Sequence, residues 1–153
     1  MPRMTTETQR AAFVDSNIWL YAFITGQDPV KHHQAKQLLA AIGTIVVSSQ
    51  VVNEVCATMI RKEKRPETDI RDFIDDFYTL YTVIDVDQSQ IVTASWLRER
   101  YGLSFWDGII VASALRSRVP ILYSEDMQDG LVIEQQLQII NPFRQASRLP
   151  DAK

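Results

Sequence analysis

The sequence is short of the residues that build disulfides and zinc sites. It has one cysteine, Cys56, and two histidines among 153 residues. A single cysteine excludes an intrachain disulfide and suits a reducing compartment. His32 and His33 are adjacent, so on a helix their side chains splay by about 100° and cannot chelate one ion as an i, i+4 pair would. We expect both histidines at the surface and a packed thiol at Cys56.

Long hydrophobic runs and an excess of positive charge are also missing. No apolar stretch approaches the roughly 20 residues of a membrane-spanning helix, and residues 1–10 lack the apolar core of a signal peptide. We therefore expect no membrane contact and a cytoplasmic location. Sixteen basic and 19 acidic residues give a net charge of −3, the wrong sign for coating nucleic acid by bulk charge. Any polyanion must be bound through a local basic patch or through cations.

What is present is an ordinary globular composition, with 46% hydrophobic and 23% charged residues. The length suits one domain with a core, which we place at residues 11–145 between flexible termini at 1–10 and 146–153. Short apolar segments alternate with segments of helical periodicity. This alternation predicts an α/β fold whose sheet is mostly parallel and covered by helices on both faces.

About five strands are expected, at residues 13–14, 44–48, 82–86, 120–123 and 137–140. The first strand turns into a helix that Ser16 or Asn17 could cap. Further helices are expected at residues 29–42, 50–62, 66–80, 88–101 and 105–116, with Ser104 as the cap of the last and only a short helix or turn between residues 126 and 137.

Four acidic residues occur where a strand gives way to a helix or in the first turns of that helix: Asp15, Glu54, Asp107 and Asp126. In a parallel sheet these positions lie toward one edge, outside the carboxyl ends of the strands. Each acid also has a structural interpretation, because acids are favoured near helix N-termini and Ser104-x-x-Asp107 resembles a capping box. This structural interpretation fits Glu54 less well, because Glu54 interrupts an apolar stretch where a carboxylate is costly to bury.

Four carboxylates at one edge would repel each other. At about 5 Å and an effective dielectric of about 20 each pair costs roughly 3 kcal/mol, more than the roughly 0.3–1 kcal/mol that a helix dipole supplies. Either some acids are protonated or cations lie among them. Oxygen donors without cysteine or histidine favour Mg²⁺ or Mn²⁺ over Zn²⁺, and a carboxylate-bound magnesium suits phosphoryl chemistry.

Four motifs follow one another along the chain: Phe-Val-Asp-Ser-Asn at 13–17, Asn-Glu at 53–54, Phe-Trp-Asp-Gly-Ile-Ile-Val-Ala at 105–112, and Leu-Tyr-Ser-Glu-Asp-Met-Gln-Asp-Gly at 122–130. In order, spacing and strand-end context this set resembles the PIN-domain nucleases, in particular the small single-domain proteins that include the VapC-type toxins of toxin–antitoxin pairs. The resemblance implies a three-layer α/β/α sandwich, Mg²⁺- or Mn²⁺-dependent endonucleolytic cleavage of RNA, an antitoxin as partner and a homodimer.

The resemblance also implies roles for individual residues. Catalytic, metal-binding roles carry over to Asp15, Glu54, Asp107 and Asp126. Orienting roles carry over to Asn17 and Ser124. The last motif holds three acids, so whether Glu125, Asp126 or Asp129 completes the site stays open; we take Asp126 as the ligand and Asp129 as a residue that supports it.

Two other functions fit parts of the pattern. A receiver-type phospho-acceptor domain also places acids at strand ends over Mg²⁺, but it needs a lysine at the end of a late strand, where this chain has Tyr123-Ser124. A PIN-like binding module with a weak or vestigial site would keep the fold, although all four acids are present here.

Outside these motifs, the basic cluster at 61–65 is a solvated helix end or a guide for an RNA backbone. Trp106, next to Asp107, is the tryptophan that could touch a base.

Overall fold

The computed structural model describes residues 10–24, 26 and 28–144. The segments 1–9 and 145–153, which hold nearly all of the expected flexible termini, lie outside the described residues, and the domain bounds at 11–145 stay a prediction. Within the described part of the chain, no helix is both long enough and apolar enough to cross a membrane.

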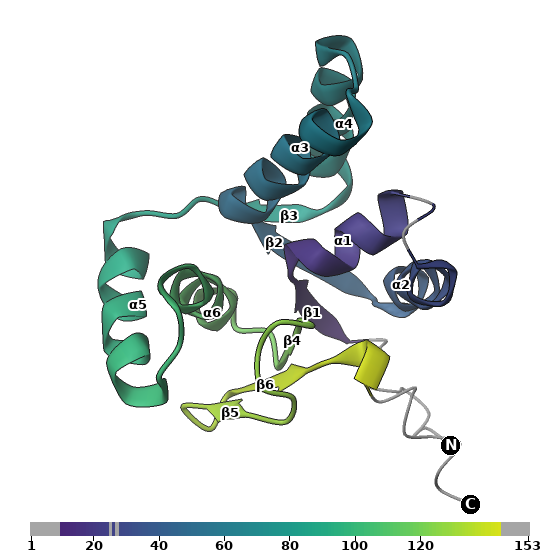
Figure 1. Cartoon of the computed structure of the whole chain (residues 1–153). Helices are drawn as coiled ribbons and strands as arrows, with labels where there is room; N and C mark the ends of the chain where they lie inside the picture. The colour runs from purple at the N-terminus through teal and green to yellow at the C-terminus, as the bar shows by residue number, and fades with distance from the viewer. Residues whose placement is uncertain (1–9, 25, 27, 145–153) are drawn as a thin grey trace, which may run out of the picture.

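A six-stranded sheet with the order β3-β2-β1-β4-β6-β5 runs through the middle of the molecule (Figure 1). Its strands are β1 (Ala11–Val14), β2 (Thr44–Ser48), β3 (Thr82–Ile84), β4 (Ile121–Tyr123), β5 (Val132–Ile133) and β6 (Leu137–Ile140). Every neighbouring pair is parallel except β5 and β6. The mostly parallel α/β sheet is confirmed.

The strand count differs from the expected five, because β5 lies where a short helix or turn was predicted. This strand is only two residues long and is joined to β6 through Glu134, Gln135 and Gln136, of which the first two have positive φ (51° and 57°). Two successive positive φ values suit the tight turn of a hairpin. Glycine or asparagine usually marks such a turn, and this turn has neither.

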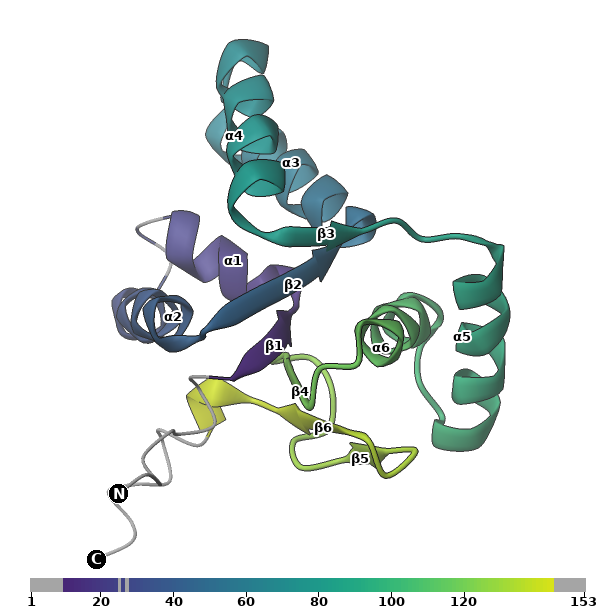
Figure 2. The same cartoon turned by 180° about the vertical axis from the view of Figure 1, so that it is seen from behind.

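Within the described residues, the sheet is covered by the helices α1 (Ser16–Phe23), α2 (Pro29–Ala41), α3 (Ser49–Glu63), α4 (Glu67–Leu80), α5 (Gln88–Tyr101) and α6 (Phe105–Ser117). The chain moves outward from β1 to β3 through α1 to α4, then returns to β4 through α5 and α6. Right-handed crossovers in opposite directions place these two groups on opposite faces, as Figures 1 and 2 show. The α/β/α layering is therefore confirmed.

The observed N-cap residues of the helices agree only in part with those predicted from the sequence. Ser104 caps α6 as predicted, with its hydroxyl accepting a hydrogen bond from the backbone N–H of Asp107. The prediction for α1 was wrong: the cap is Asp15, whose carboxylate accepts from Ser16 N, and not Ser16 or Asn17. Pro66 likewise precedes α4 as its N-cap instead of opening the helix.

Trp19 anchors α1 in the core next to the end of β1. Its indole is fully buried, lies 4.6 Å from the ring of Phe77 and 5.0 Å from that of Tyr81, and donates a hydrogen bond to the carbonyl of Val14 at 3.2 Å. Buried aromatic contacts of this kind hold a helix firmly. The residue that joins β1 to α1, Asp15, is therefore held in place from both sides.

Strands β1 and β4 are neighbours at the point where the strand order reverses. The chain leaves β1 toward β2 over one face and reaches β4 from the other. In open α/β sheets ligands bind in the crevice at such a switch point, outside the carboxyl ends of the strands. The residues that directly follow β1 and β4 are Asp15 and Ser124.

Candidate active site

Asp15 is a buried carboxylate at the junction of β1 and β4. It is 3% exposed, and its backbone N–H donates to the carbonyl of Tyr123 at 3.0 Å, extending the strand pairing by one residue. Its Oδ1 accepts from Ser16 N at 2.7 Å, and its Oδ2 accepts from the Ser124 hydroxyl at 2.8 Å. Both carboxylate oxygens are therefore oriented.

Asn17 connects α1 to the loop after β4. Its Nδ2 donates to Asp126 Oδ2 at 2.8 Å, and its Oδ1 accepts from the backbone N–H of Glu125 at 3.3 Å. The Ser124 hydroxyl accepts from the backbone N–H of Asp126 at 3.2 Å. Asn17 therefore contacts Asp126, and Ser124 contacts both Asp15 and Asp126.

The three acids of the last motif have different partners. Glu125 forms an ion pair with Lys31 on α2, and Asp129 Oδ1 accepts from the backbone N–H of Asn141 at 2.8 Å, which ties the loop to the end of β6. Asp126 is exposed and bonded to Asn17 beside Asp15. This geometry favours Asp126 as the acid of the site, and the contact of Asp129 supports the loop.

Glu54 and Asp107 come from opposite faces of the sheet. Glu54 is half-buried on α3, where Gln50, one turn earlier, donates from Nε2 to its Oε2 at 3.4 Å. Asp107 is half-buried in the first turn of α6, next to the capping residue Ser104. We refer to Asp15, Glu54, Asp107 and Asp126 together as the acidic rim.

The carboxylates of the acidic rim influence each other's protonation. Burial raises the pKa of Asp15 to about 7; the hydrogen bonds from Ser124 and Ser16 oppose the shift, while the charges of Glu54 and Asp126 add to it. The pKa of Asp107 is also raised by burial, lowered in part by Ser104 and raised again by the charge of Asp126. The four acids therefore share one electrostatic environment.

The rim is looser than the crowded cluster that the sequence suggested. Among the described residues, no three histidine, cysteine, aspartate or glutamate side chains stand close enough together to hold a metal ion as they lie. Like charges repel, and Glu54 and Asp126 instead have the amides of Gln50 and Asn17 as partners. The donor set still fits Mg²⁺ or Mn²⁺: it consists of carboxylate oxygens, and a cation would relieve the burial of the Asp15 charge.

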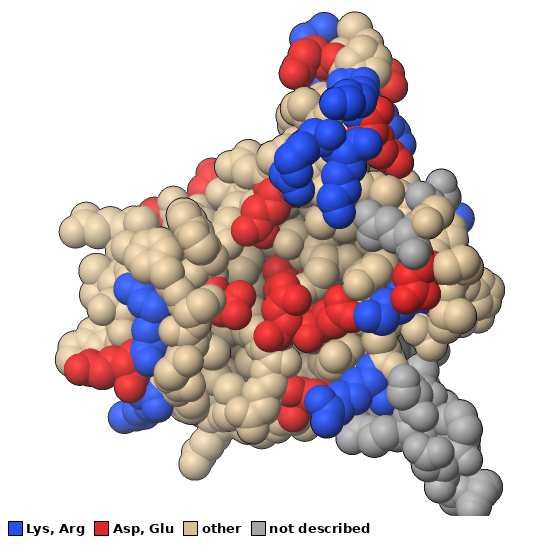
Figure 3. Space-filling view, viewed as in Figure 1, with Lys and Arg blue, Asp and Glu red and all other residues tan. Residues whose placement is uncertain are grey.

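One face of the molecule carries clusters of both signs of charge. Figure 3 shows acidic side chains gathered in the middle of this face, below the arm formed by α3 and α4, where lysine and arginine side chains gather. Arg61, Lys62 and Lys64 are exposed at the end of α3. We call these three residues the basic tip.

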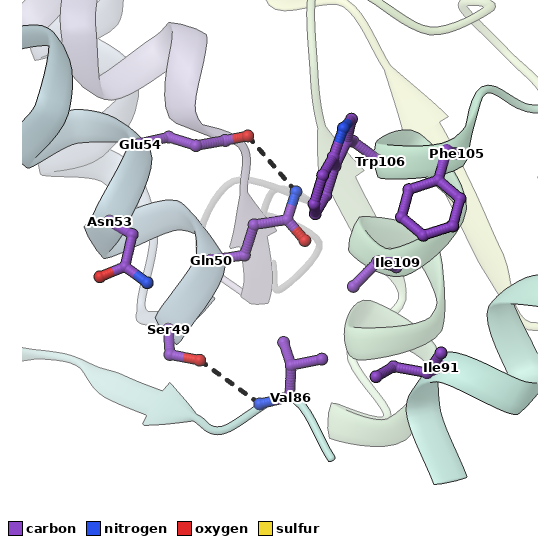
Figure 4. A pocket seen from close by; sticks show the side chains of 9 residues that line it. All are labelled: Ser49, Gln50, Asn53, Glu54, Val86, Ile91, Phe105, Trp106 and Ile109. Carbon is purple, nitrogen blue, oxygen red and sulfur yellow. Dashed lines mark hydrogen bonds between the residues drawn. The ribbon is translucent and has the colours of Figure 1, made fainter. Parts of the chain in front are cut away.

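Beside the acidic rim lies a hollow of about 570 Å³ between α3 and α6 (Figure 4). Its wall includes Gln50 and Glu54 from one side and Phe105, Trp106 and Ile109 from the other. The sequence indicated Trp106 but not Gln50 or Phe105. The only signal for Gln50 was its position four residues before Glu54, which puts both on one helix face.

The other residues singled out in the sequence lie away from the rim. Cys56 is buried, and burial raises the pKa of its thiol, in agreement with a packed cysteine. His33 is exposed as expected, whereas His32 is half-buried and its Nδ1 lies 2.8 Å from the carbonyl oxygen of Tyr21. Trp19 is in the core, and Trp96 is 69% exposed on α5.

A parallel α/β/α sandwich with acids at its switch point defines a class of site that other proteins share. The model of the PIN domain family matches residues 12–128 of this chain. The match covers well over half of the sequence, and the chain belongs to the PIN domain family, which confirms the resemblance to these nucleases.

Solved structures show the same fold. A toxin–antitoxin complex from Klebsiella pneumoniae contains a chain that is 23% identical with a TM-score of 0.63, over 86% of this chain and 97% of that one. VapC20 of Mycobacterium tuberculosis, a sarcin–ricin loop cleaving toxin, is 22% identical with a TM-score of 0.61, over 72% and 86%. VapBC2 from Rickettsia felis, bound to a DNA fragment from its promoter, is 19% identical with a TM-score of 0.57, over 86% and 99%. No curated protein matches the sequence.

Proposed function

We propose that this protein is a divalent-metal-dependent endoribonuclease and the toxin of a type II toxin–antitoxin pair. The observation that carries the proposal is the buried carboxylate of Asp15 at the switch point, with a pKa raised to about 7 and with Glu54 and Asp126 near enough to add to that shift. A buried acid in this electrostatic setting is typical of a functional site. Membership of the PIN domain family supports the same reaction class.

The acidic rim would hold Mg²⁺ or Mn²⁺. When bound, the metal supplies a water of lowered pKa and stabilises charge on the phosphate. Ser124 and Ser16 hold the carboxylate of Asp15 in one orientation, and Asn17 does the same for Asp126. We assign no general base among the side chains, since both histidines lie on α2, apart from the motifs of the rim.

The substrate is single-stranded RNA that approaches across the face shown in Figure 3. The basic tip attracts the phosphate backbone, which compensates locally for the net charge of −3. The acids below it would repel the same backbone unless cations were present. Cleavage therefore depends on added divalent metal.

An antitoxin protein is the proposed partner, and the toxin is a homodimer in the cytoplasm. Support comes from the similar folds of chains in toxin–antitoxin complexes from Klebsiella pneumoniae and Rickettsia felis. A partner that carries basic side chains would complement the acidic rim and block its access to RNA.

Substitution of the rim tests the proposal. Asp15→Asn and Asp107→Asn remove a charge without removing volume, so the fold should survive while RNA cleavage in Mn²⁺ falls by about 100-fold or more. Asp76→Asn, at an exposed acid on α4, is the matched control and should cleave like the wild type. Circular dichroism checks the fold of each variant. Retained cleavage in both rim variants would refute the site.

A further inference from the structure

Lys31 lies at a position where a lysine is unfavourable for its own helix. It is in the first turn of α2, three residues after the N-cap Asp28, and its backbone N–H donates to the Asp28 carboxylate at 3.1 Å. The N-terminus of a helix carries partial positive charge, so a cation in the first turn destabilises the helix. Residues that break a local rule are concentrated at functional sites. The contacts of the Lys31 side chain are therefore informative.

The ammonium group of Lys31 is held from several sides. It forms an ion pair with the carboxylate of Glu125, in the loop after β4. It also lies 5.1 Å from the ring centroid of Tyr21 on α1 and 5.4 Å from that of Phe143, which follows β6. These two rings are 5.2 Å apart in an edge-to-face arrangement. A lysine loses much rotamer freedom when it is fixed in this way, so the arrangement is costly to form for an ordinary surface residue.

Glu125, the acid that Lys31 holds, is also connected to the acidic rim. The backbone N–H of Glu125 donates to Oδ1 of Asn17 at 3.3 Å, and Nδ2 of the same amide donates to Oδ2 of Asp126 at 2.8 Å. The Asn17 amide therefore contacts Glu125 through its oxygen and Asp126 through its nitrogen. A shift of Glu125 would remove the hydrogen bond that fixes this amide and would change the orientation of the Asp126 carboxylate.

Asp126 depends on such support more than Asp15 does. Asp15 is buried, and both of its carboxylate oxygens accept hydrogen bonds. Asp126 is exposed in a loop, and its carboxylate has the Asn17 amide as its partner. Like charges repel, so an exposed carboxylate next to other acids turns away from them unless it is held. The position of Asp126 is therefore set by the contacts that hold its loop.

We propose that Lys31 is a positioning residue for Asp126 as a metal ligand. Lys31 holds the side chain of Glu125, the backbone of Glu125 holds Asn17, and Asn17 orients the Asp126 carboxylate. The inference rests on the proposed function, which makes Asp126 a ligand of Mg²⁺ or Mn²⁺. Partners behind a metal ligand strengthen binding because they fix the direction of the ligand before the ion arrives.

Two other roles for Lys31 lead to different results. A partly exposed ion pair that only stabilises the fold contributes little and leaves metal affinity unchanged. A lysine that contacts an RNA phosphate changes KM and its salt dependence, but not the binding of Mn²⁺. The ammonium group is already paired with Glu125, which a phosphate would have to displace. This pairing favours positioning over a phosphate contact.

Two substitutions of Glu125 separate the contact from the charge. Glu125→Gln and Glu125→Leu remove the same charge and have similar size, but only glutamine keeps an oxygen that accepts from Lys31. Electron paramagnetic resonance of free Mn²⁺ measures the affinity of each variant. We expect the affinity of Glu125→Gln to stay within a fewfold of the wild type. That of Glu125→Leu should fall by about tenfold, the lower end of the usual loss when an outer-shell partner is removed.

Lys31→Met breaks the same contact from the other side. Methionine keeps an unbranched stem that packs against aromatic rings. Lys31→Met removes a positive charge and Glu125→Leu removes a negative one, so charge alone would shift their Mn²⁺ affinities in opposite directions. Positioning predicts a loss of about tenfold in both. Lys36→Met, at an exposed lysine on the same helix, is the matched control and should bind Mn²⁺ like the wild type.

Amide hydrogen exchange in EDTA measures the loop without metal and without RNA. In Glu125→Leu and Lys31→Met, the backbone N–H at position 125 should exchange at least about tenfold faster than in the wild type, after correction for intrinsic rates. The reason is that its hydrogen bond to Asn17 opens more often. The N–H of Leu122, in the middle of β4, should exchange at the wild-type rate, which shows that the sheet is intact.

The outcomes that overturn the inference differ from failure of the proposed function. A wild-type protein that neither binds Mn²⁺ nor cleaves RNA contradicts the proposed function, and the role of Lys31 falls with it. If the wild type does both, unchanged or oppositely shifted Mn²⁺ affinities in Glu125→Leu and Lys31→Met contradict the positioning role alone, as does unchanged exchange at position 125. A raised KM for RNA in Lys31→Met with wild-type Mn²⁺ affinity would make Lys31 a phosphate contact instead.

Discussion

The hydroxyl of Ser124 donates to Oδ2 of Asp15 at 2.8 Å, joining residues 109 positions apart in the sequence. The same hydroxyl accepts from the backbone N–H of Asp126. One serine therefore connects the acid that follows β1 to the acid that follows β4. The pairing of Val14 with Tyr123 in the sheet brings the two together, so the geometry of the rim depends on the rigid part of the fold.

Neighbouring acids in the last motif should respond differently to loss of charge. Asp126→Asn removes a carboxylate of the rim, and we expect RNA cleavage in Mn²⁺ to fall by about 100-fold or more. Glu125→Gln removes only the charge that pairs with Lys31 at a partly exposed site, so activity should stay within a fewfold of the wild type. The steady-state cleavage rates of the two variants measure this difference. The reverse ranking would show that Glu125, not Asp126, completes the site.

The stability of the metal-free protein should fall as the pH rises from about 4 to about 7. The pKa of Asp15 in the folded protein is about 7, above its ordinary value of 3.8. In this window the folded protein therefore holds a proton that the unfolded chain has released, and its stabilising effect is lost as the pH rises. The full effect is on the order of 4 kcal/mol. Urea denaturation in EDTA at pH values across the window measures it.

Asp15→Asn is the control for this pH dependence, because asparagine cannot titrate. The variant should lose most of the slope, and the remainder should come from Asp107, whose pKa is raised in the same direction. Asp87 acts at lower pH: Arg116 lowers its pKa to about 2, so its contribution is lost only as the pH falls below about 4. A wild-type stability that is flat or rises between pH 4 and 7 would contradict the burial of a protonated Asp15.

The basic tip should control RNA affinity rather than chemistry. Replacing Arg61, Lys62 and Lys64 by glutamine should raise KM and leave kcat nearly unchanged. The slope of log KM against log salt should become shallower by about 0.7 for each RNA phosphate that the variant no longer neutralises. Lys36→Gln, at an exposed lysine on α2, is the matched control. A triple variant with the wild-type salt dependence would mean that RNA approaches along another path.

Gly108 lets α6 approach α5 closely. A Cβ at this position would lie 2.8 Å from Cγ of Arg98 and 3.2 Å from the carbonyl oxygen of Ala94. Gly108→Ala should therefore destabilise the fold by about 1–2 kcal/mol, even though alanine is the better helix former. Thermal or urea unfolding measures the change. Adding Arg98→Ala should recover part of the stability by removing the nearer atom; no recovery would place the strain at the backbone of Ala94.

The parts of the fold that the sequence predicts well are those with a clear local signal. Buried parallel strands such as β2 and β6 are short apolar runs, and their bounds at 44–48 and 137–140 agree with the prediction. The two-residue β5 is too short for any period to show. The cap of α1 was assigned one or two residues too late, because Asp15 turns its carboxylate onto the first N–H of its own helix.

The position of the acids at one edge of the sheet was predictable from the sequence, but their individual contacts were not. Strand-end context alone placed Asp15 and Asp126 at the same edge of the sheet. The contacts that distinguish the acids of the last motif, such as the pairing of Glu125 with Lys31, link residues far apart in the sequence and depend on how α2 packs.

The proposed function requires that the acids of the rim come together around a divalent cation. Anomalous diffraction from a crystal grown with Mn²⁺ tests it most directly. We expect an ion within about 2.0–2.3 Å of carboxylate oxygens of Asp15 and at least one other rim acid, with the side chains of Glu54 or Asp126 turned toward it from their amide partners. Anomalous density that is absent from the rim at saturating Mn²⁺, with the four acids still apart, would contradict it.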